Sequence, residues 1–256
     1  MKNAYLSINK DLWNVDAPNW VEVAHDHWAR DTPIWGTWNN RNEELQLLPD
    51  DMTGLDAVAL GCGTGYVSCW MARRGARVTA IDQSCEQLQT AHRLLEEHGG
   101  DIRFIEGNAE ETGLPDAAFD FAISEYGASI WCPPGAWLKE AWRLLRPGGR
   151  LVFLGNHPLS LICSPLDGAP ADRTLHRPYR DMWGADWTEV EIEPSGVCFN
   201  LTMAGWMDVF ATTGFAVEKY QELYAPDWAE GTRAAIPADW AKQFPVEQVW
   251  HLRKAG

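Results

Sequence analysis

The chain has 256 residues, of which 46% are apolar and 22% charged, so it can build a full hydrophobic core in one large domain. Its 21 lysine and arginine residues face 36 aspartate and glutamate residues, and the resulting formal charge of -15 disfavours nucleic acid and anionic membranes as partners. No apolar run approaches the roughly 20 residues that cross a bilayer, and residues 1–10 do not have the pattern of a signal peptide. We therefore expect a soluble, cytoplasmic protein.

Residues 1–50 carry two predicted helical segments, 6–13 and 20–30, followed by a loop that contains Trp35 and Trp38. The sequence holds 15 tryptophans, and this region is rich in them. Such aromatic side chains most often pack a segment onto the core, but Trp35 and Trp38 could instead cover a ligand.

A glycine-rich turn follows at residues 57–66. Four apolar residues run into Gly61, Gly63 and Gly65, and an amphipathic pattern begins just beyond. This predicts a buried strand, a tight turn and a helix whose unpaired N–H groups point at a polar ligand. A dinucleotide fingerprint would need a third glycine at position 66, where the chain has Tyr66.

Strands and helices then alternate up to about residue 154, which predicts a doubly wound parallel sheet with ligands at the carboxyl ends of its strands. Asp82 ends the second strand about 20 residues beyond Gly61, where such folds place an acid against ribose hydroxyls. An ordinary charge at the start of a helix is the structural alternative for this residue. The six cysteines show no Cys-x-x-Cys pair and no zinc-type spacing to histidine, so we expect free thiols and no metal.

Five motifs in order carry a family resemblance. They are the Leu-Gly-Cys-Gly-Thr-Gly turn, Asp82, Gly-Asn-Ala-Glu at 107–110, Phe-Asp-Phe-Ala-Ile-Ser at 119–124 and Leu-Leu-Arg-Pro-Gly-Gly-Arg-Leu at 144–151. Together they resemble class I S-adenosylmethionine (SAM) methyltransferases, in particular the small-molecule group that includes ubiquinone and menaquinone biosynthesis enzymes. The resemblance implies an α/β, Rossmann-like, doubly wound seven-stranded sheet, with residues 206–218 and 245–254 in its final helix and two closing strands.

The same resemblance implies a cofactor site for SAM and its product S-adenosylhomocysteine (SAH). Two positions depart from the family pattern, which usually has acidic residues where this chain has Ala59 and Asn108. The implied cofactor residues are Gly61, Cys62, Gly63, Gly65, Asp82, Gln83, Asn108, Ala109, Glu110 and Glu125.

Methyl transfer to oxygen or nitrogen can use a general base, and three residues are candidates for the reaction centre: His157, Glu125 and Tyr126. His157 follows the fifth strand and could equally fix its loop through backbone hydrogen bonds, while Glu125 could be a cofactor contact without catalytic duty. Residues 157–201 resemble the family least, include an expected antiparallel pair at 188–192 and 197–201, and are interpreted as a lid that selects the substrate. Expected substrate contacts are Trp35, Trp38, Trp131, His176, Tyr179 and Trp183, with Trp187 as a further wall candidate that could equally be a packing residue.

We thus expect one methyltransferase domain, divided into a helical cap (1–50), a SAM-binding core (51–156), a lid (157–201) and the closing elements (202–256). It would act as a monomer or homodimer on a small organic acceptor at oxygen, nitrogen or carbon. Two alternatives remain open: a non-catalytic SAM-binding regulatory protein, and a nicotinamide-dependent oxidoreductase, against which Tyr66 counts.

Overall fold

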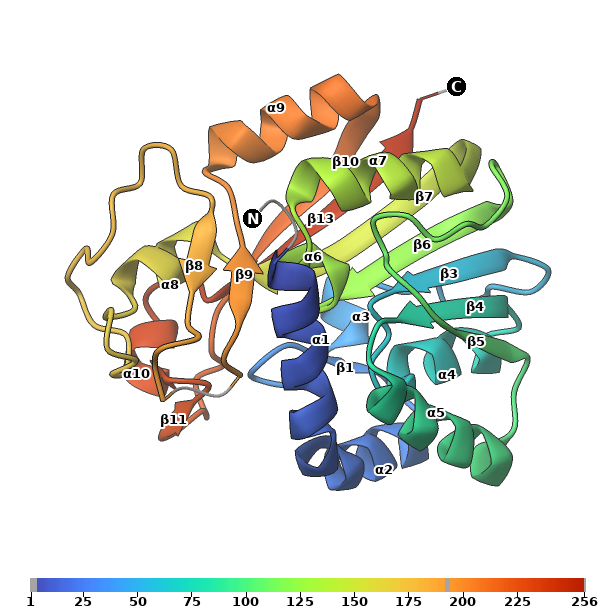
Figure 1. Ribbon diagram of the computed structural model, residues 1–256, viewed down its shortest axis with the longest axis horizontal. Helices are drawn as coiled ribbons and strands as arrows, with labels where there is room; N and C mark the ends of the chain where they lie inside the picture. Colours follow the sequence, from blue (N-terminus) through green and yellow to red (C-terminus); the bar gives the residue numbers. More distant parts are fainter. Residues whose placement is uncertain (1–3, 192–193, 256) are drawn as a thin grey trace.

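The computed structural model describes residues 4–191 and 194–255 and is built around a seven-stranded sheet (Figure 1). No helix within these described stretches is long and apolar enough to cross a membrane. In spatial order the strands are β10 (Phe215–Leu223), β13 (Glu247–Lys254), β7 (Leu145–Asn156), β6 (Phe119–Glu125), β3 (Asp56–Leu60), β4 (Arg77–Asp82) and β5 (Ile102–Glu106).

The last five strands in this spatial order, β7, β6, β3, β4 and β5, are parallel to one another. Strand β13 runs antiparallel to both of its neighbours, β7 and β10. Strands β3 and β6 are buried almost throughout, because helices cover both faces of a parallel sheet. The carboxyl ends of β3, β4 and β6 consequently meet at one edge. The expected doubly wound seven-stranded fold is confirmed.

Helices form a layer on each face of this sheet (Figure 1). One layer contains α2 (Val21–Ala29), α4 (Tyr66–Arg73) and α5 (Cys85–His98), and the other contains α6 (Ala128–Trp131), α7 (Pro134–Leu144) and α9 (Met203–Thr213). Ser84 caps α5 by accepting a hydrogen bond from the N–H of Gln87 at 3.2 Å. This cap fixes where α5 begins, and the apolar side of the helix packs on the sheet.

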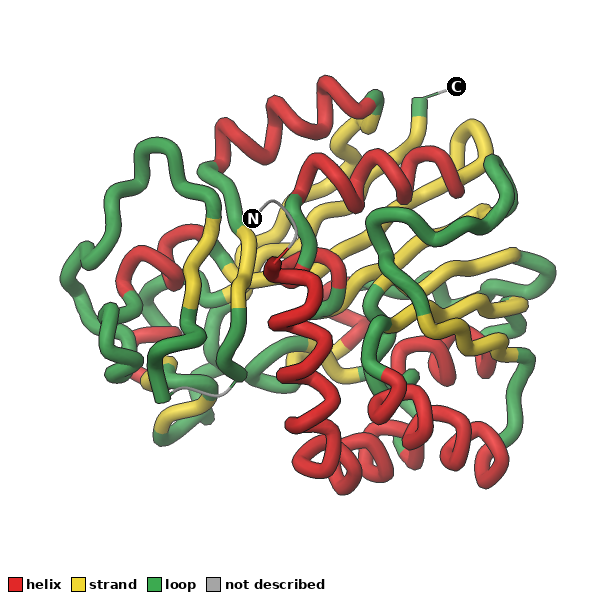
Figure 2. The backbone as a smooth tube through the Cα atoms, viewed as in Figure 1, coloured by secondary structure: helices red, strands yellow, loops and turns green. Residues whose placement is uncertain are grey.

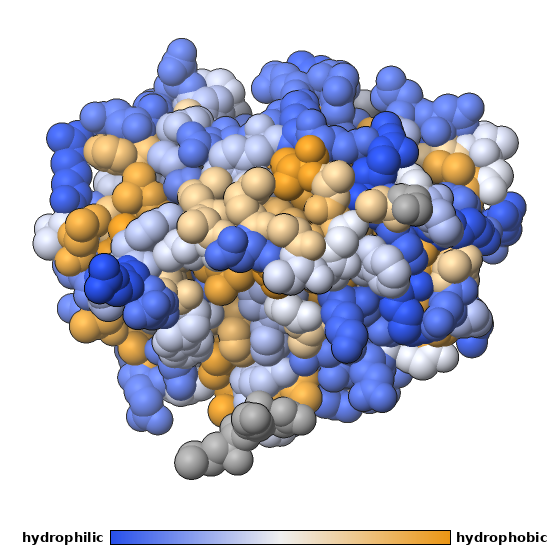
Figure 3. Space-filling view, turned by 90° about the horizontal axis from the view of Figure 1, so that it is seen from above, coloured by the Kyte–Doolittle hydropathy of each residue, from blue (hydrophilic) through white to orange (hydrophobic). Residues whose placement is uncertain are grey.

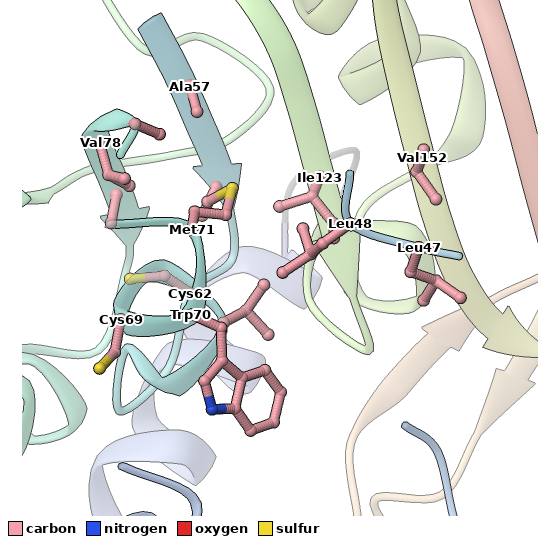
Figure 4. Close-up of a cluster of buried hydrophobic side chains, with 14 of the residues drawn as sticks. Leu47, Leu48, Ala57, Cys62, Cys69, Trp70, Met71, Val78, Ile123 and Val152 are labelled. Carbon is pink, nitrogen blue, oxygen red and sulfur yellow. The ribbon is translucent and has the colours of Figure 1, made fainter. Parts of the chain in front are cut away.

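A short segment after a one-turn helix covers part of one face of the sheet. Leu47 and Leu48 follow α3 (Asn42–Leu45) and lie against Ile123 and Val152 of β6 and β7, while Trp70 of α4 covers the other half of the same core (Figure 4). All five side chains are nearly or fully buried. Continuous apolar packing therefore supports the strands that lead to the glycine turn.

The N-terminal region forms α1 (Ala4–Asp16), η1 (Ala17–Trp20) and α2, which confirms the two expected helical segments. Helix α1 crosses the carboxyl-end edge of the sheet beside α5 and the cap (Figure 1). Two two-residue strands, β1 (Ile34–Trp35) and β2 (Asn40–Arg41), pair to fold the following loop back on itself.

A cap, made mostly of loops, stands beside the sheet (Figure 2). It combines residues 157–201 with residues 224–246, although the sequence division placed the second stretch with the closing elements. Together with Trp38, Ile130 and Trp131 they bury an apolar cluster. The regular elements of the cap are α8 (Pro158–Cys163), β8 (Gly184–Asp186), β9 (Val197–Phe199), β11 (Thr232–Arg233), β12 (Ile236–Pro237) and α10 (Ala238–Ala241).

The antiparallel pair expected in the cap is present with one arm displaced. Strand β9 lies within the expected residues 197–201, but its partner is β8 rather than residues 188–192. Asp186 accepts hydrogen bonds from the N–H and hydroxyl of Thr188, and this turn ends β8 before the expected strand begins. Residue 192 of that expected strand lies outside the described residues.

Seen from the side of α9, the surface is mainly hydrophilic around a central area of more hydrophobic side chains (Figure 3). Exposed apolar residues in the described chain include Met207 of α9 and Trp183 of the cap. Most other large apolar side chains are used in the three cores.

Candidate functional site

The glycine turn after β3 has the backbone geometry that the sequence predicts. Gly61 and Gly63 have φ values of +73° and +51°, in the left-handed region that disfavours other residues. A Cβ on Gly61 would lie 2.6 Å from the backbone of Gly127 and Ala128, so this position needs glycine for packing. A Cβ on Gly63 would meet nothing within 4 Å, so its backbone faces open space where a ligand can approach.

That open space is a cavity of about 110 Å³ at the carboxyl ends of the central strands, here called the glycine-turn cavity. It brings together all of the expected cofactor residues except Gly65 and Glu110. Its lining residues are Trp13, Trp20, Gly61, Cys62, Gly63, Thr64, Tyr66, Ile81, Asp82, Gln83, Gln87, Gly107, Asn108, Ala109, Glu125, Tyr126, Gly127, Ala128, Trp131 and Cys132.

Asp82, the last residue of β4, links the glycine turn to that strand. One carboxylate oxygen accepts from the N–H of Gly63 at 2.8 Å and the other accepts from the N–H of Ser84 at 2.9 Å. Burial raises the pKa of Asp82, and these backbone donors oppose that shift. The carboxylate can still accept further hydrogen bonds from hydroxyls in the cavity.

Gln87 supplies a polar atom that is buried without a partner. Its Nε2 donor makes no hydrogen bond within the described chain, although Gln87 lines the glycine-turn cavity. A nucleoside with hydroxyls and ring nitrogens fits these groups, because Asp82 can accept, Gln87 can donate and the bare backbone of Gly63 leaves room.

A second, larger cavity of about 600 Å³ lies between the core and the cap, and we call it the cap cavity. Its lining is largely apolar and includes Val23, Ile34, Ile130, Leu161, Trp187, Ile236 and Val246. The two cavities share six lining residues, namely Trp13, Trp20, Tyr66, Glu125, Tyr126 and Trp131. A ligand in one cavity would therefore face a ligand in the other across these side chains.

Glu125 is the acid at this shared wall. Its carboxylate accepts a short hydrogen bond from the Tyr66 hydroxyl and a longer one, 3.4 Å, from the N–H of Gly36. Burial raises the pKa of Glu125 from 4.5 to about 7, the Tyr66 and Gly36 hydrogen bonds oppose the shift, and the charge of Glu247 adds to it. Near neutral pH the group can therefore both hold and release a proton.

Glu247, at the start of β13, forms a second carboxylate close by. It accepts hydrogen bonds from the hydroxyl of Tyr126 and from the N–H of Thr37, the latter at 2.6 Å. It is fully buried, its Oε2 has no partner among the described atoms, and burial raises its pKa. Consecutive N–H groups of Gly36 and Thr37 thus hold the two carboxylates.

Two expected substrate contacts, Trp35 and Trp38, are placed in the core instead. Both are fully buried, and the indole of Trp35 donates to Asn42 at 3.0 Å and packs on Trp70. The residues between them, Gly36 and Thr37, face the cap cavity. Of the expected substrate residues, Trp131 lines both cavities.

The expected cluster of His176, Tyr179 and Trp183 lies outside the lining of both cavities. His176 bonds Asp172 at 2.9 Å, and the hydroxyl of Tyr179 accepts from the N–H of Met203 at 2.8 Å. Trp183 is 52% exposed on the outer side of the cap. Trp187, the further wall candidate, does line the cap cavity.

His157 has a different environment from the one expected of a general base. Its Nδ1 accepts from the N–H of Leu159 at 3.0 Å and so caps α8, and its Nε2 lies 3.5 Å from the carboxylate of Glu222. The ring is buried, its pKa is lowered by that burial, and it lines neither described cavity. The structural alternative weighed for His157, fixing its loop by backbone hydrogen bonds, matches these contacts.

Gly65 and Glu110 also act in packing rather than at the cavity surface. A Cβ on Gly65 would lie 2.7 Å from the ring of Phe104, so the glycine allows α4 to begin against β5. Both carboxylate oxygens of Glu110 lie 2.8 Å from the hydroxyl of Tyr5, which links α1 to the loop after β5.

Comparisons with known proteins agree with this geometry. Residues 58–153 match the family model described as "Methyltransferase domain". Over 228 residues the chain is 30% identical to a ubiquinone biosynthesis O-methyltransferase of Methylocella silvestris, a match that covers 78% of this chain and 84% of that protein. A malonyl-[acyl-carrier protein] O-methyltransferase of Pectobacterium atrosepticum is 38% identical over 113 residues, covering 43% of this chain and 42% of the relative.

In several other curated matches the aligned region likewise spans about half of the relative's length. The crystal structure of an S-adenosylmethionine dependent methyltransferase from Mesorhizobium loti shares the fold, with a TM-score of 0.64 and 24% identity, covering 82% of this chain and 94% of that one. The long match to the Methylocella silvestris protein extends the likeness beyond the domain core to most of both chains. The chain belongs to the S-adenosylmethionine-dependent methyltransferase family.

Proposed function

We propose that this chain transfers a methyl group from SAM to a hydroxyl group of a small apolar or aromatic acceptor. The observation that carries the proposal is the wall that the two cavities share, because it brings a polar nucleoside site and an apolar acceptor site to the same side chains. SAM, when bound, supplies a methyl group activated on a sulfonium sulfur. The residues of the chain have to position the acceptor, exclude water and remove a proton.

In this proposal the glycine-turn cavity holds the cofactor. Asp82 accepts from the ribose hydroxyls, the backbone of Gly63 lies against the amino-acid portion, and Gln87 donates to the remaining polar groups. Gln83, Asn108 and Ala109 surround the base. The family usually has an acidic residue at the position of Ala59. In this chain Ala59 is a residue of β3 that is buried in the hydrophobic core, and it lines neither described cavity.

Glu125 is the proposed general base and Tyr126 the residue beside it that shapes the shared wall. Glu125 is supported by its place between the two cavities and by a pKa of about 7, which suits proton removal near neutral pH. The relatives named as O-methyltransferases favour an oxygen acceptor. His157 is not part of this proposal, because its ring caps α8.

The acceptor would lie in the cap cavity. Trp13, Trp20, Trp131 and Trp187 give this cavity aromatic walls, which suit an acceptor with an aromatic or apolar body. We propose in addition that the chain works in the cytoplasm. Its substrates would be free small molecules rather than nucleic acid or anionic membrane, because its formal charge of -15 repels polyanions. Whether it does so as a monomer or a homodimer is tested by its mass in solution.

The test is a calorimetric titration of the purified protein with SAH and with NAD, followed by turnover assays on a panel of phenols. We expect SAH to bind and NAD to give no heat. Asp82→Ala should weaken SAH binding about 10- to 100-fold, because the loss of charge-assisted acceptors costs roughly 1.5–3 kcal/mol. Binding of SAH without methylation of any acceptor would instead favour a regulatory SAM-binding protein, and NAD binding would favour an oxidoreductase.

A further inference from the structure

The cap cavity contains one strongly basic side chain. Among the described residues that line it, Arg233 is the single arginine or lysine. The other basic candidate, His27, has its pKa lowered by burial, which favours the neutral ring. Of the acidic side chains that the structure describes, Glu125 alone is in this lining, and it lies at the wall shared with the glycine-turn cavity.

Arg233 is held by a hairpin with an unusual turn. Strands β11 and β12 pair Arg233 with Ile236, so the turn consists of Ala234 and Ala235 alone (Figure 1 labels β11 at the lower side of the cap). Both alanines have positive φ, +45° and +58°. A two-residue turn of this kind normally uses Asn or Gly, and strain at non-glycine residues is typical of segments that face a ligand.

The guanidinium of Arg233 is fixed without neutralising its charge. It lies 5.2 Å from the ring centre of Trp38, and its Nη1 donates to the carbonyl of Thr37 at 3.2 Å. No carboxylate pairs with it in the part of the chain that the structure describes. The ring and the carbonyl orient the group but leave most of its five N–H donors available.

A guanidinium held in this way is suited to a planar or tetrahedral anion. Its free N–H groups can bind a carboxylate or a phosphate with two parallel hydrogen bonds, which an amide or an ether cannot match. The overall charge of -15 would repel such a ligand at long range, so recognition of an anion needs a local cation at the cavity. Arg233 is exposed, so the bound anion would remain near water at the mouth.

We propose that Arg233 binds an acidic group of the acceptor, so that the substrate class is an aromatic or apolar hydroxyl compound that also carries a carboxylate or phosphate. This inference rests on the proposed function, since it treats the cap cavity as the acceptor site. The apolar body would fill the cavity, the hydroxyl would face Glu125 and the acid would remain at Arg233.

The test compares two probes of equal shape, 6-hydroxy-2-naphthoate and its neutral amide, by calorimetry on the SAH-saturated protein. We expect the carboxylate to bind about tenfold more tightly than the amide, which corresponds to one charge-assisted contact near the surface. Arg233→Met should abolish this preference, whereas Arg233→Lys should retain part of it. 2-Naphthyl phosphate shows whether a phosphate is preferred over a carboxylate.

Arg173→Met is the matched control. Arg173 also lies over an aromatic ring, 5.8 Å from the centre of Phe244, and bonds Gln243 at 3.0 Å, but it does not line the cap cavity. It should keep the wild-type preference. Equal affinity of the wild type for the two probes, no binding of either probe, or an unchanged preference in Arg233→Met would overturn the proposal. Failure of SAH itself to bind would count against the cofactor site instead.

Discussion

At the scale of residues, burial and a hydrogen bond from Tyr66 shift the pKa of Glu125 in opposite directions. Burial raises its pKa to about 7, and the hydrogen bond from Tyr66 is the largest influence that opposes the rise. Tyr66→Phe removes the hydroxyl but keeps a ring that packs 4.7 Å from His27 and 5.2 Å from Trp70. The pKa of Glu125 should then increase, and the rising limb of kcat against pH should move to higher pH.

Glu125→Gln provides the reference for this experiment. It keeps the size of the side chain but cannot accept a proton, so the rising limb near pH 7 should disappear and kcat should fall by about 10²- to 10⁴-fold. A shift of the limb to lower pH in Tyr66→Phe, or wild-type kcat in Glu125→Gln, would show that another group accepts the proton.

At the scale of elements, α1 is joined to the cap by the buried side chain of Asn9. Asn9 accepts from the N–H of Val197 at 2.9 Å and donates to the carbonyls of Val197 at 2.9 Å and Trp131 at 3.3 Å. It thereby joins the free edge of β9 as a strand would. The same helix carries Trp13, which lines both cavities.

Asn9→Ala should therefore lower the free energy of unfolding by about 2 kcal/mol, because buried backbone groups lose their partner. It should also weaken SAH binding, since α1 would be held less firmly over the glycine-turn cavity by its remaining contacts, such as that of Tyr5 with Glu110. Urea denaturation and calorimetry measure the two effects. Ser7→Ala is the control on the same helix, where the exposed hydroxyl bonds only the carbonyl of Ala4; an equal loss in both variants would contradict the role of Asn9.

The elements that the sequence predicts well are those with local signals. The strand, glycine turn and Asp82 follow from residues close together in the chain, and all lie where the pattern implies. Glu247 and Thr37 could not be found in this way, because only the pairing of β13 with β7 and the fold of the β1–β2 loop bring them to Tyr126. The neighbouring residues in the sequence likewise do not indicate that Trp35 is buried in the core whereas Trp131 lines a cavity.

His157 illustrates a local signal that was available. A side-chain acceptor directly before Pro158 and Leu159 is typical of a helix start, since proline favours the first helical position. Residues 224–246 join the cap through apolar contacts between segments distant in sequence, and no local pattern indicates such contacts. The sequence around Tyr66 counts against a dinucleotide site but does not indicate its hydrogen bond to Glu125.

At the scale of the whole molecule, the acidic groups of the site reduce stability at the pH where they are needed. The pKa of Glu125 is about 7 in the folded chain and 4.5 in the reference state, so the folded state binds more protons between these values. The stabilisation from this protonation is complete below about pH 4.5 and is lost as the pH rises through 7. Burial raises the pKa of Glu247 and Asp82 in the same direction.

Glu125→Gln removes this dependence, because the amide stays neutral at every pH. Between pH 5.5 and 8.5 the wild type should therefore lose stability relative to the variant. The difference in the free energy of unfolding should change by at most about 2 kcal/mol, because pH 5.5 lies about 1.5 units below the pKa of about 7 and each unit corresponds to about 1.4 kcal/mol. Urea denaturation of both proteins at the two pH values measures the difference, and Glu96→Gln on the exposed face of α5 is the surface control. A constant difference between variant and wild type would mean that Glu125 is already ionised at pH 5.5. A gain that accompanies the loss of turnover would mean that the chain gives up stability near neutral pH to keep a buried base at the wall between its two cavities.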